Sequence, residues 1–234
     1  MVYQITENIF AIGKTIHKPD KKFTFIAYLI TGNVNVLIDT LPLRYADMLR
    51  QELKKLLGNE KLDFLVLNHS EEDHSGALSE IQKEYPEMEI YCTEECQERL
   101  SEQLKNKKYH LVKSADEVSL GDNVFHFYKT PGLHWDDNMV TFLEKENILF
   151  SNDLFGQLAA CEPPIDHQYA EENFMQALSD YYIRVFSEAS KEQKKNAIDV
   201  LKLPVCMIAP AHGILIKKFC HLHWSIIKGN FHSS

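Results

Sequence analysis

The chain lacks an excess of basic residues. It has 25 Lys and Arg against 34 Asp and Glu over 234 residues, which gives a formal net charge of -9 at pH 7. Nucleic acids and anionic membrane surfaces attract basic proteins, and no stripe of Lys and Arg compensates for the acidic balance. We therefore expect neither nucleic acid nor a membrane among its partners.

Long hydrophobic runs are also missing. No segment reaches the roughly 18 apolar residues that a membrane-spanning helix requires. The N-terminal residues 1–7 lack the basic and apolar regions of a secretory signal peptide. The five cysteines are odd in number and contain no Cys-x-x-Cys pair, which favours reduced thiols over disulfides or a cysteine zinc site. These absences predict a cytoplasmic protein.

No linker rich in Gly, Ser or Pro divides the chain, and its apolar patterns alternate between strand and helix. Hydrophobic periodicity predicts helices at residues 45–57, 75–85, 94–104, 170–189 and 191–202. It predicts strands at residues 3–5, 9–12, 23–30, 34–39, 64–67, 89–92, 124–128, 139–143, 148–151 and 205–209. This order favours two sheets with helices outside them, an α+β sandwich.

One hexapeptide carries four possible metal ligands directly after the strand at residues 64–67. His69, Glu71, Asp73 and His74 lie within six positions, and two imidazoles with two carboxylates suit a pair of metal ions better than one. Alternation along the turn predicts that the first three side chains point the same way and that the helix start brings His74 round. The alternative is a solvated polar loop before a helix.

Three further residues follow predicted strand ends. His134, Asp153 and His212 each have an ordinary alternative, as a core histidine, a helix cap and a loop residue respectively. Strand ends gather at one edge of a sheet, where ligands usually bind. We therefore expect these three side chains to join the hexapeptide.

Together these residues resemble the di-iron domain of the flavodiiron proteins, which is built on the metallo-β-lactamase fold, an αββα four-layer sandwich. The matching motifs are His69-x-Glu71-x-Asp73-His74, His134 before a tryptophan, Asp153 in Phe-Ser-Asn-Asp-Leu-Phe-Gly and His212 in Ala-Pro-Ala-His-Gly. Zinc hydrolases of this fold usually carry a histidine in place of Glu71. The resemblance implies a domain over residues 1–215, followed by a tail over 216–234.

The resemblance also implies a ligand set for two iron ions with bridging oxo, hydroxo or peroxo oxygen. His69, Glu71 and His134 would hold one iron, the other would be held by Asp73, His74 and His212, and Asp153 would bridge them. Three carboxylates leave a diferrous site with a charge of about +1, and the oxygen donor Glu71 favours iron or manganese over zinc. Candidate pocket residues are His17, Trp135, Phe155, Tyr181 and Tyr182.

Flavodiiron proteins continue into a flavodoxin module, whereas only 22 residues follow His212 and none form a phosphate-binding loop. We therefore expect no FMN and no built-in electron source. The first hypothesis is an oxygen and iron sensor of bacterial chemotaxis, not an efficient enzyme, that works with a receptor and histidine kinase. The alternative is a reductase of oxygen or nitric oxide supplied by a separate flavoprotein or rubredoxin, and a third is a zinc hydrolase. The oligomeric state stays open.

Overall fold

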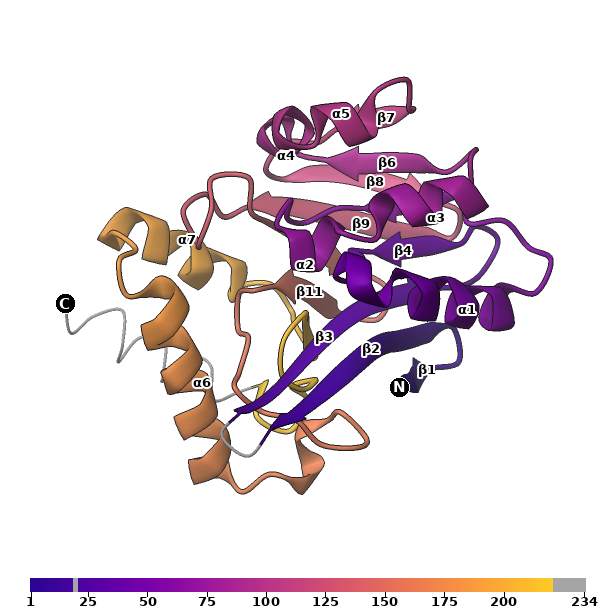
Figure 1. The fold of residues 1–234 in the computed structure, drawn as a ribbon. Helices are drawn as coiled ribbons and strands as arrows, with labels where there is room; N and C mark the ends of the chain where they lie inside the picture. The colour runs from indigo at the N-terminus through magenta and orange to yellow at the C-terminus, as the bar shows by residue number, and fades with distance from the viewer. Residues whose placement is uncertain (19–20, 221–234) are drawn as a thin grey trace.

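A computed structural model describes residues 1–18 and 21–220, which form two β-sheets with helices on their outer faces (Figure 1). The side chain of His17 and the tail beyond residue 220 lie outside the described part, so the expectations placed on them stay predictions. Among the described residues, no helix is both long and apolar enough to cross a lipid bilayer.

The first sheet has seven strands whose spatial order follows the sequence. Its first four strands pair antiparallel and the remaining pairs are parallel. The strands are β1 (Val2–Thr6), β2 (Ile9–Lys18), β3 (Lys21–Ile30), β4 (Val36–Ile38), β5 (Phe64–Val66), β6 (Glu89–Cys92) and β7 (Tyr109–Leu111). Its helices are α1 (Ala46–Leu57), α2 (Glu72–Ser75), α3 (Leu78–Glu84), α4 (Glu94–Arg99) and α5 (Ser101–Leu104).

The second sheet has five strands in the order β12-β11-β10-β9-β8, and only β11 and β12 pair in parallel. Its strands are β8 (Asp116–Leu120), β9 (Asn123–Lys129), β10 (Met139–Leu143), β11 (Ile148–Asn152) and β12 (Met207–Pro210). Helices α6 (Glu171–Phe186) and α7 (Lys191–Val200) cover it on the side away from α1 and α3 (Figure 1). Short 3-10 turns occur at Leu43–Tyr45 and Asp166–Gln168.

Alternation along the strands builds the layers. In β4, Leu37 packs under α1, whereas Val36 and Ile38 face the second sheet. In β10, Phe142 packs towards α6 and α7, and Leu143 faces the first sheet. Successive strand residues point to opposite faces, so a strand that is apolar throughout must be covered on both sides. The predicted α+β four-layer sandwich is confirmed.

Several boundaries differ from the sequence predictions. The helix expected at 75–85 covers only Leu78–Glu84, and the separate short helix Glu72–Ser75 precedes it, because the Ala77 amide donates to Leu41 O at 2.9 Å and leaves the helical ladder. The helix expected at 94–104 divides at Leu100. The strand expected at 34–39 covers only 36–38, since the Asn35 amide donates to the Asp63 carboxylate. Strands β7 and β8 were not predicted, because they are short and rich in polar residues.

Candidate metal centre

The structure brings all seven predicted ligand residues together at one edge of the sandwich. The hexapeptide follows β5, Asp153 follows β11 and His212 follows β12, while His134 lies in the connection between β9 and β10. Their ligand atoms form two groups, each with all atoms within 4.8 Å of one another. The groups are His69, Glu71, His134 and Asp153, and Asp73, His74 and His212.

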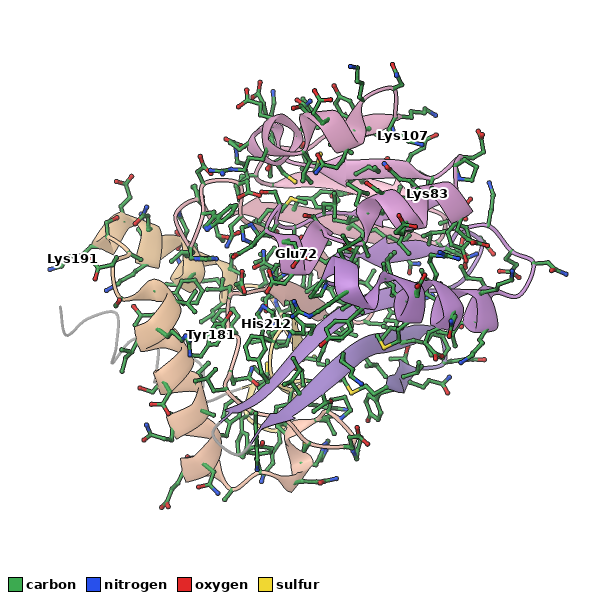
Figure 2. The ribbon with its side chains drawn as sticks, in the orientation of Figure 1. Glu72, Lys83, Lys107, Tyr181, Lys191 and His212 are labelled. Carbon is green, nitrogen blue, oxygen red and sulfur yellow. The ribbon has the colours of Figure 1, made fainter. Side chains whose placement is uncertain are left out.

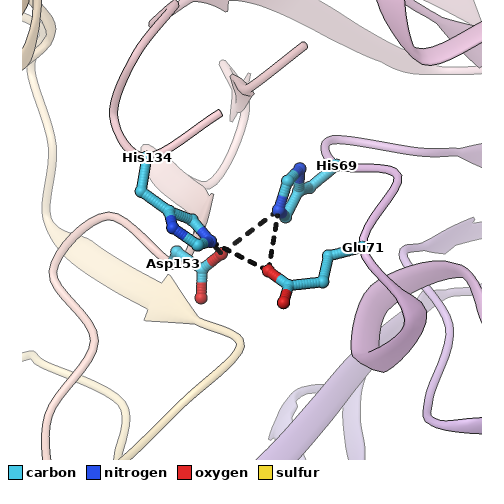
Figure 3. Close-up of side chains that lie close together, drawn as sticks. All are labelled: His69, Glu71, His134 and Asp153. Carbon is cyan, nitrogen blue, oxygen red and sulfur yellow. Dashed lines mark hydrogen bonds and ion pairs between the residues drawn. The ribbon is translucent and has the colours of Figure 1, made fainter. Parts of the chain in front are cut away.

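The first group surrounds one oxygen of Glu71. His134 Nε2 lies 2.8 Å and His69 Nε2 3.3 Å from Glu71 Oε2, and both imidazoles lie 3.7 Å from Asp153 Oδ2 (Figure 3). Hydrogen bonds from His134 and His69 lower the pKa of Glu71 to about 2. This carboxylate is therefore ionised and available as an anionic ligand at neutral pH.

The second group is arranged around Asp73. His212 Nε2 lies 3.3 Å from Asp73 Oδ2, and His74 Nε2 lies 3.6 Å from Asp73 Oδ1. Alternation along the turn wrongly predicted that Asp73 would point with His69 and Glu71. Helix α2 begins at Glu72, so the side-chain period changes from two to 3.6 residues and turns Asp73 towards His212.

Asp153 faces both groups. Its Oδ2 lies 3.3 Å from His74 Nε2, and its Oδ1 lies 3.1 Å from His212 Nε2, in addition to its contacts with the first group. Burial raises the pKa of Asp153, but the charges of His74 and His212 and their hydrogen bonds outweigh burial and hold it well below its usual range. One buried carboxylate is thus shared between the two halves of the cluster.

The cluster fits metal ions on its own chemistry. Asp73 Oδ1, His74 Nε2 and Asp153 Oδ2 are buried and make long ion-pair contacts of 3.3 and 3.6 Å with one another, with no well-formed hydrogen bond among the described residues. Buried polar atoms that are poorly satisfied are costly, and these three belong to a cluster of four imidazoles and three carboxylates. Divalent cations would satisfy these atoms and offset the negative charge.

A cavity of about 300 Å³ opens beside both groups. Tyr181 of α6 projects towards His212, with ring centroids 6.1 Å apart, and its hydroxyl donates a 2.8 Å hydrogen bond to Asp153 Oδ1 (Figure 2). Burial, followed by the charge of Asp153, raises the pKa of Tyr181 well above its usual value, so it stays a neutral donor. Apolar lining comes from Phe23, Leu158 and Val185, which sequence reasoning missed.

The other predicted pocket residues lie elsewhere. Trp135 contacts His69 edge-on, with ring centroids 5.0 Å apart, but lines a neighbouring cavity of about 670 Å³. Tyr182 packs against Phe186 instead of lining the metal cavity, and Phe155 is buried in the core beneath α6. Of the predicted aromatic residues, Tyr181 is the one that lines the metal cavity.

Two residues accept hydrogen bonds from the outer nitrogens of two histidines that are predicted ligands. His69 Nδ1 donates to the buried Asp137 at 3.2 Å, and His212 Nδ1 donates to the carbonyl oxygen of Thr24 at 2.9 Å. Each bond leaves the inner nitrogen of the ring facing the cluster. Gly213 follows His212 with a φ of +96°, and a side chain there would overlap Gln157. Neither Asp137 nor Thr24 was predicted.

A buried polar network holds the start of the hexapeptide in place. The Asn68 amide donates to Asp39 Oδ1 at 2.7 Å, and Thr141 Oγ1 donates to the Asn68 side chain at 2.6 Å. Met139 N also donates to Asn68 O at 3.0 Å. The network ties β4, β5 and β10 together directly behind His69, so the ligand loop starts from a rigid point.

A family model described as "ODP family beta lactamase" matches residues 23–213. This chain belongs to that family. The ODP-family domain is 36% identical over 206 residues to a coenzyme F420H₂ oxidase from Methanothermobacter marburgensis, covering 81% of this chain and 50% of the relative. It is 32% identical to an anaerobic nitric oxide reductase flavorubredoxin from Klebsiella pneumoniae, covering 86% of this chain and 43% of the relative.

Solved structures agree with the family assignment. A variant of a flavo di-iron protein from Thermotoga maritima is 25% identical and superposes with a TM-score of 0.86 over 99% of this chain and 60% of its own. The predicted membership of the flavodiiron group is confirmed. The ODP-family domain spans about half the length of the curated relatives it matches.

Replacing Asp137 tests how strongly the ODP-family domain depends on the orientation of His69. We expect Asp137→Asn to weaken metal binding about 10- to 100-fold, because the imidazole loses the carboxylate that orients it. Anaerobic competition with a chelator measures this affinity. Asp136→Asn is the matched control, since Asp136 is exposed and pairs with Arg99 at 2.6 Å. Equal affinities in the two variants would contradict the role of Asp137.

Metal loading should release protons. Burial lowers the pKa values of His69 and His212, but hydrogen bonds to neighbouring carboxylates outweigh it and raise each to about 10 in the metal-free protein. Both imidazoles are therefore protonated at pH 7 and must become neutral to bind a metal. We expect release of at least about two protons per chain, since the pKa of His74 is raised as well, and an apparent affinity that rises with pH up to about 10. A pH indicator in weak buffer would detect this release, and its absence would count against both ligands.

Proposed function

We propose that this chain binds two iron ions in the cluster and reduces a diatomic oxidant, dioxygen or nitric oxide, with electrons from a separate redox protein. The observation that carries the proposal is the shared carboxylate of Asp153, which faces both ligand groups beside a cavity. Two metals held by these groups would both lie beside this carboxylate, and together they would supply the electrons that reduction of one oxidant needs.

The donor set supports iron over zinc. Glu71 stands in the group that also contains His69 and His134, and it contributes a hard oxygen donor to that group. With seven protein ligands for two metals that accept five or six each, coordination positions stay open towards the cavity. This reasoning counts against the hydrolase, whose zinc site would have a histidine in place of Glu71.

Bound iron would supply redox equivalents and open coordination positions, and the protein's own residues would shape the reaction space. Phe23, Leu158 and Val185 give one side of the cavity an apolar lining that suits small uncharged molecules. Tyr181 donates to Asp153 and presents a protonated phenol at the cavity. Asp137 and Thr24 orient His69 and His212, whose inner nitrogens would then face the bound metals.

The similarity to two curated relatives supports the reductase over the oxygen sensor of chemotaxis. Their printed names are those of an oxidase and a nitric oxide reductase. Because the chain spans about half of those proteins, their electron donors and substrates remain proposals for this chain. The chemotaxis receptor and histidine kinase stay sequence predictions.

Oxidant consumption under continuous electron supply tests the proposal. We would load the protein with Fe²⁺ under anaerobic conditions and supply electrons through a photoreduced flavin while following dioxygen or nitric oxide with an electrode. The proposal predicts consumption of many equivalents per chain, and the zinc-loaded protein should show none. Binding of about one equivalent without turnover would contradict the reductase and favour the sensor.

Tyr181→Phe tests the phenol at the cavity. We expect turnover to fall about tenfold with iron content unchanged, because the variant removes only the donor to Asp153. Tyr182→Phe is the matched control from the same helix, since Tyr182 does not line the metal cavity. Similar turnover in both variants would show that the Tyr181 hydroxyl does not contribute to the reaction.

A further inference from the structure

Two cysteines line one small cavity on the face opposite the first sheet. The cavity holds about 340 Å³, and Cys206, Cys220 and Val205 contribute to its wall. Cys220 Sγ donates to the carbonyl oxygen of Val205 at 3.5 Å. Since that oxygen lies about 3 Å from the Cα of the next residue, the Cys220 sulfur lies within about 6.5 Å of the Cys206 Cα.

Their exposure separates this pair from the other three cysteines. Cys206 is exposed and Cys220 is half-buried, whereas Cys92 and Cys96 are fully buried. Cys161 is half-buried and donates to the carbonyl oxygen of Pro163 at 3.0 Å. Cys206 is the one exposed cysteine of the five, and Cys220 lines the same cavity.

The two cysteines enclose the part of the chain that carries His212. Cys206 precedes β12, and its amide donates to Asn147 O at 2.8 Å. Beyond His212 the chain returns alongside β12, where Ile208 and Ile216 exchange two backbone hydrogen bonds of 2.9 Å. Both cysteines therefore line one cavity at the two ends of the segment that carries His212.

We propose that Cys206 and Cys220 form a peroxide-responsive dithiol, which closes residues 206–220 into a ring around His212 as a disulfide. The exposed Cys206 thiolate attacks a hydroperoxide, breaks its O–O bond and becomes a sulfenic acid while water or an alcohol leaves. The Cys220 thiol then attacks this sulfur, forms the S–S bond and releases water. The hydroperoxide is thereby reduced by two electrons.

The surroundings of the two thiols decide which of them reacts first with the hydroperoxide. Burial, followed by the charges of Cys206 and Asp166, raises the pKa of Cys220 to about 11. The half-buried thiol is thus protected from direct oxidation, and the exposed one reacts first. Closing the ring restricts local opening of the segment that carries His212, so the oxidised protein should lose metal to a chelator more slowly than the reduced protein.

Peptide mapping of the purified full chain tests the proposal. Trypsin cuts after Lys217 and Lys218, so the two cysteines fall on separate peptides. After treatment with hydrogen peroxide and alkylation, we expect these peptides to be joined, two hydrogen atoms lighter than their sum, and separated again by dithiothreitol. Cys220→Ser should abolish the joined peptide, and Cys161→Ser should retain it.

Three outcomes would overturn the proposal. Oxidation of Cys206 to its sulfinic acid without cross-linking would show that Cys220 cannot reach it. A disulfide between two molecules, or one formed with another cysteine, would show that Cys206 and Cys220 are not the reacting pair. Equal rates of metal loss from oxidised and reduced wild-type protein would show that the disulfide does not restrict the segment that carries His212. None of these outcomes depends on whether the metal centre reduces oxygen or nitric oxide.

Discussion

Asp153→Asn is expected to reduce iron binding at both positions of the cluster. The substitution keeps the shape of the side chain but removes the negative charge that faces His74, His212 and the first ligand group. Loss of residues that only orient a ligand costs about 10- to 100-fold in affinity, so loss of a shared ligand should cost at least about 100-fold. Anaerobic iron analysis after dialysis measures the result.

Asp166→Asn is the control for the loss of any buried carboxylate. Asp166 is as buried as Asp153, but it accepts hydrogen bonds from the amides of Lys217 and Phe219 and lies outside the cluster. This control should bind iron like the wild type at a temperature where both are folded. If Asp153→Asn also retained two irons at wild-type affinity, Asp153 could not be the shared ligand.

Glu71→Gln is expected to remove one metal and leave the other. Glu71 contacts only the first group, where His134 and His69 approach its Oε2 at 2.8 and 3.3 Å. The second group keeps Asp73, His74, His212 and the shared Asp153. Anaerobic titration should therefore give about one tightly bound iron per chain instead of about two.

Glu72→Gln provides a control that differs by one position. Glu72 is exposed, and its Oε1 accepts a 2.8 Å hydrogen bond from the Leu43 amide, away from the ligand groups. The Glu72→Gln variant should retain both metals. A loss of both irons in Glu71→Gln, or equal loss in the two variants, would show that the two ligand groups are not separable as the geometry indicates.

The sequence predicted which residues gather in the cluster because most of them follow a recognisable strand or belong to one dense motif. His69, Glu71, Asp73 and His74 are neighbours in the chain, and Asp153 and His212 follow apolar strands whose ends meet at one edge. Hydrophobic alternation also predicted the two sheets and their outer helices, because it reports which faces are buried. These signals are local and need no knowledge of loop paths.

The supporting residues could not be predicted because they depend on how loops fold back. Asp137 reaches His69 only because the connection after β9 returns to the hexapeptide, where its carboxylate also accepts the Ser70 amide at 2.7 Å. Phe23 stacks on His212 with ring centroids 4.5 Å apart. The next residue, Thr24, accepts a hydrogen bond from His212, although the two are 188 positions apart in the chain. No periodicity in the sequence encodes such contacts.

The central claim is that two metals share Asp153 between the two ligand groups. The most direct test is anomalous X-ray diffraction at the iron absorption edge from crystals loaded with Fe²⁺ under anaerobic conditions. The account predicts two peaks per chain, one in each ligand group and both within bonding distance of the Asp153 carboxylate. A single peak, or two peaks of which only one contacts Asp153, would contradict it.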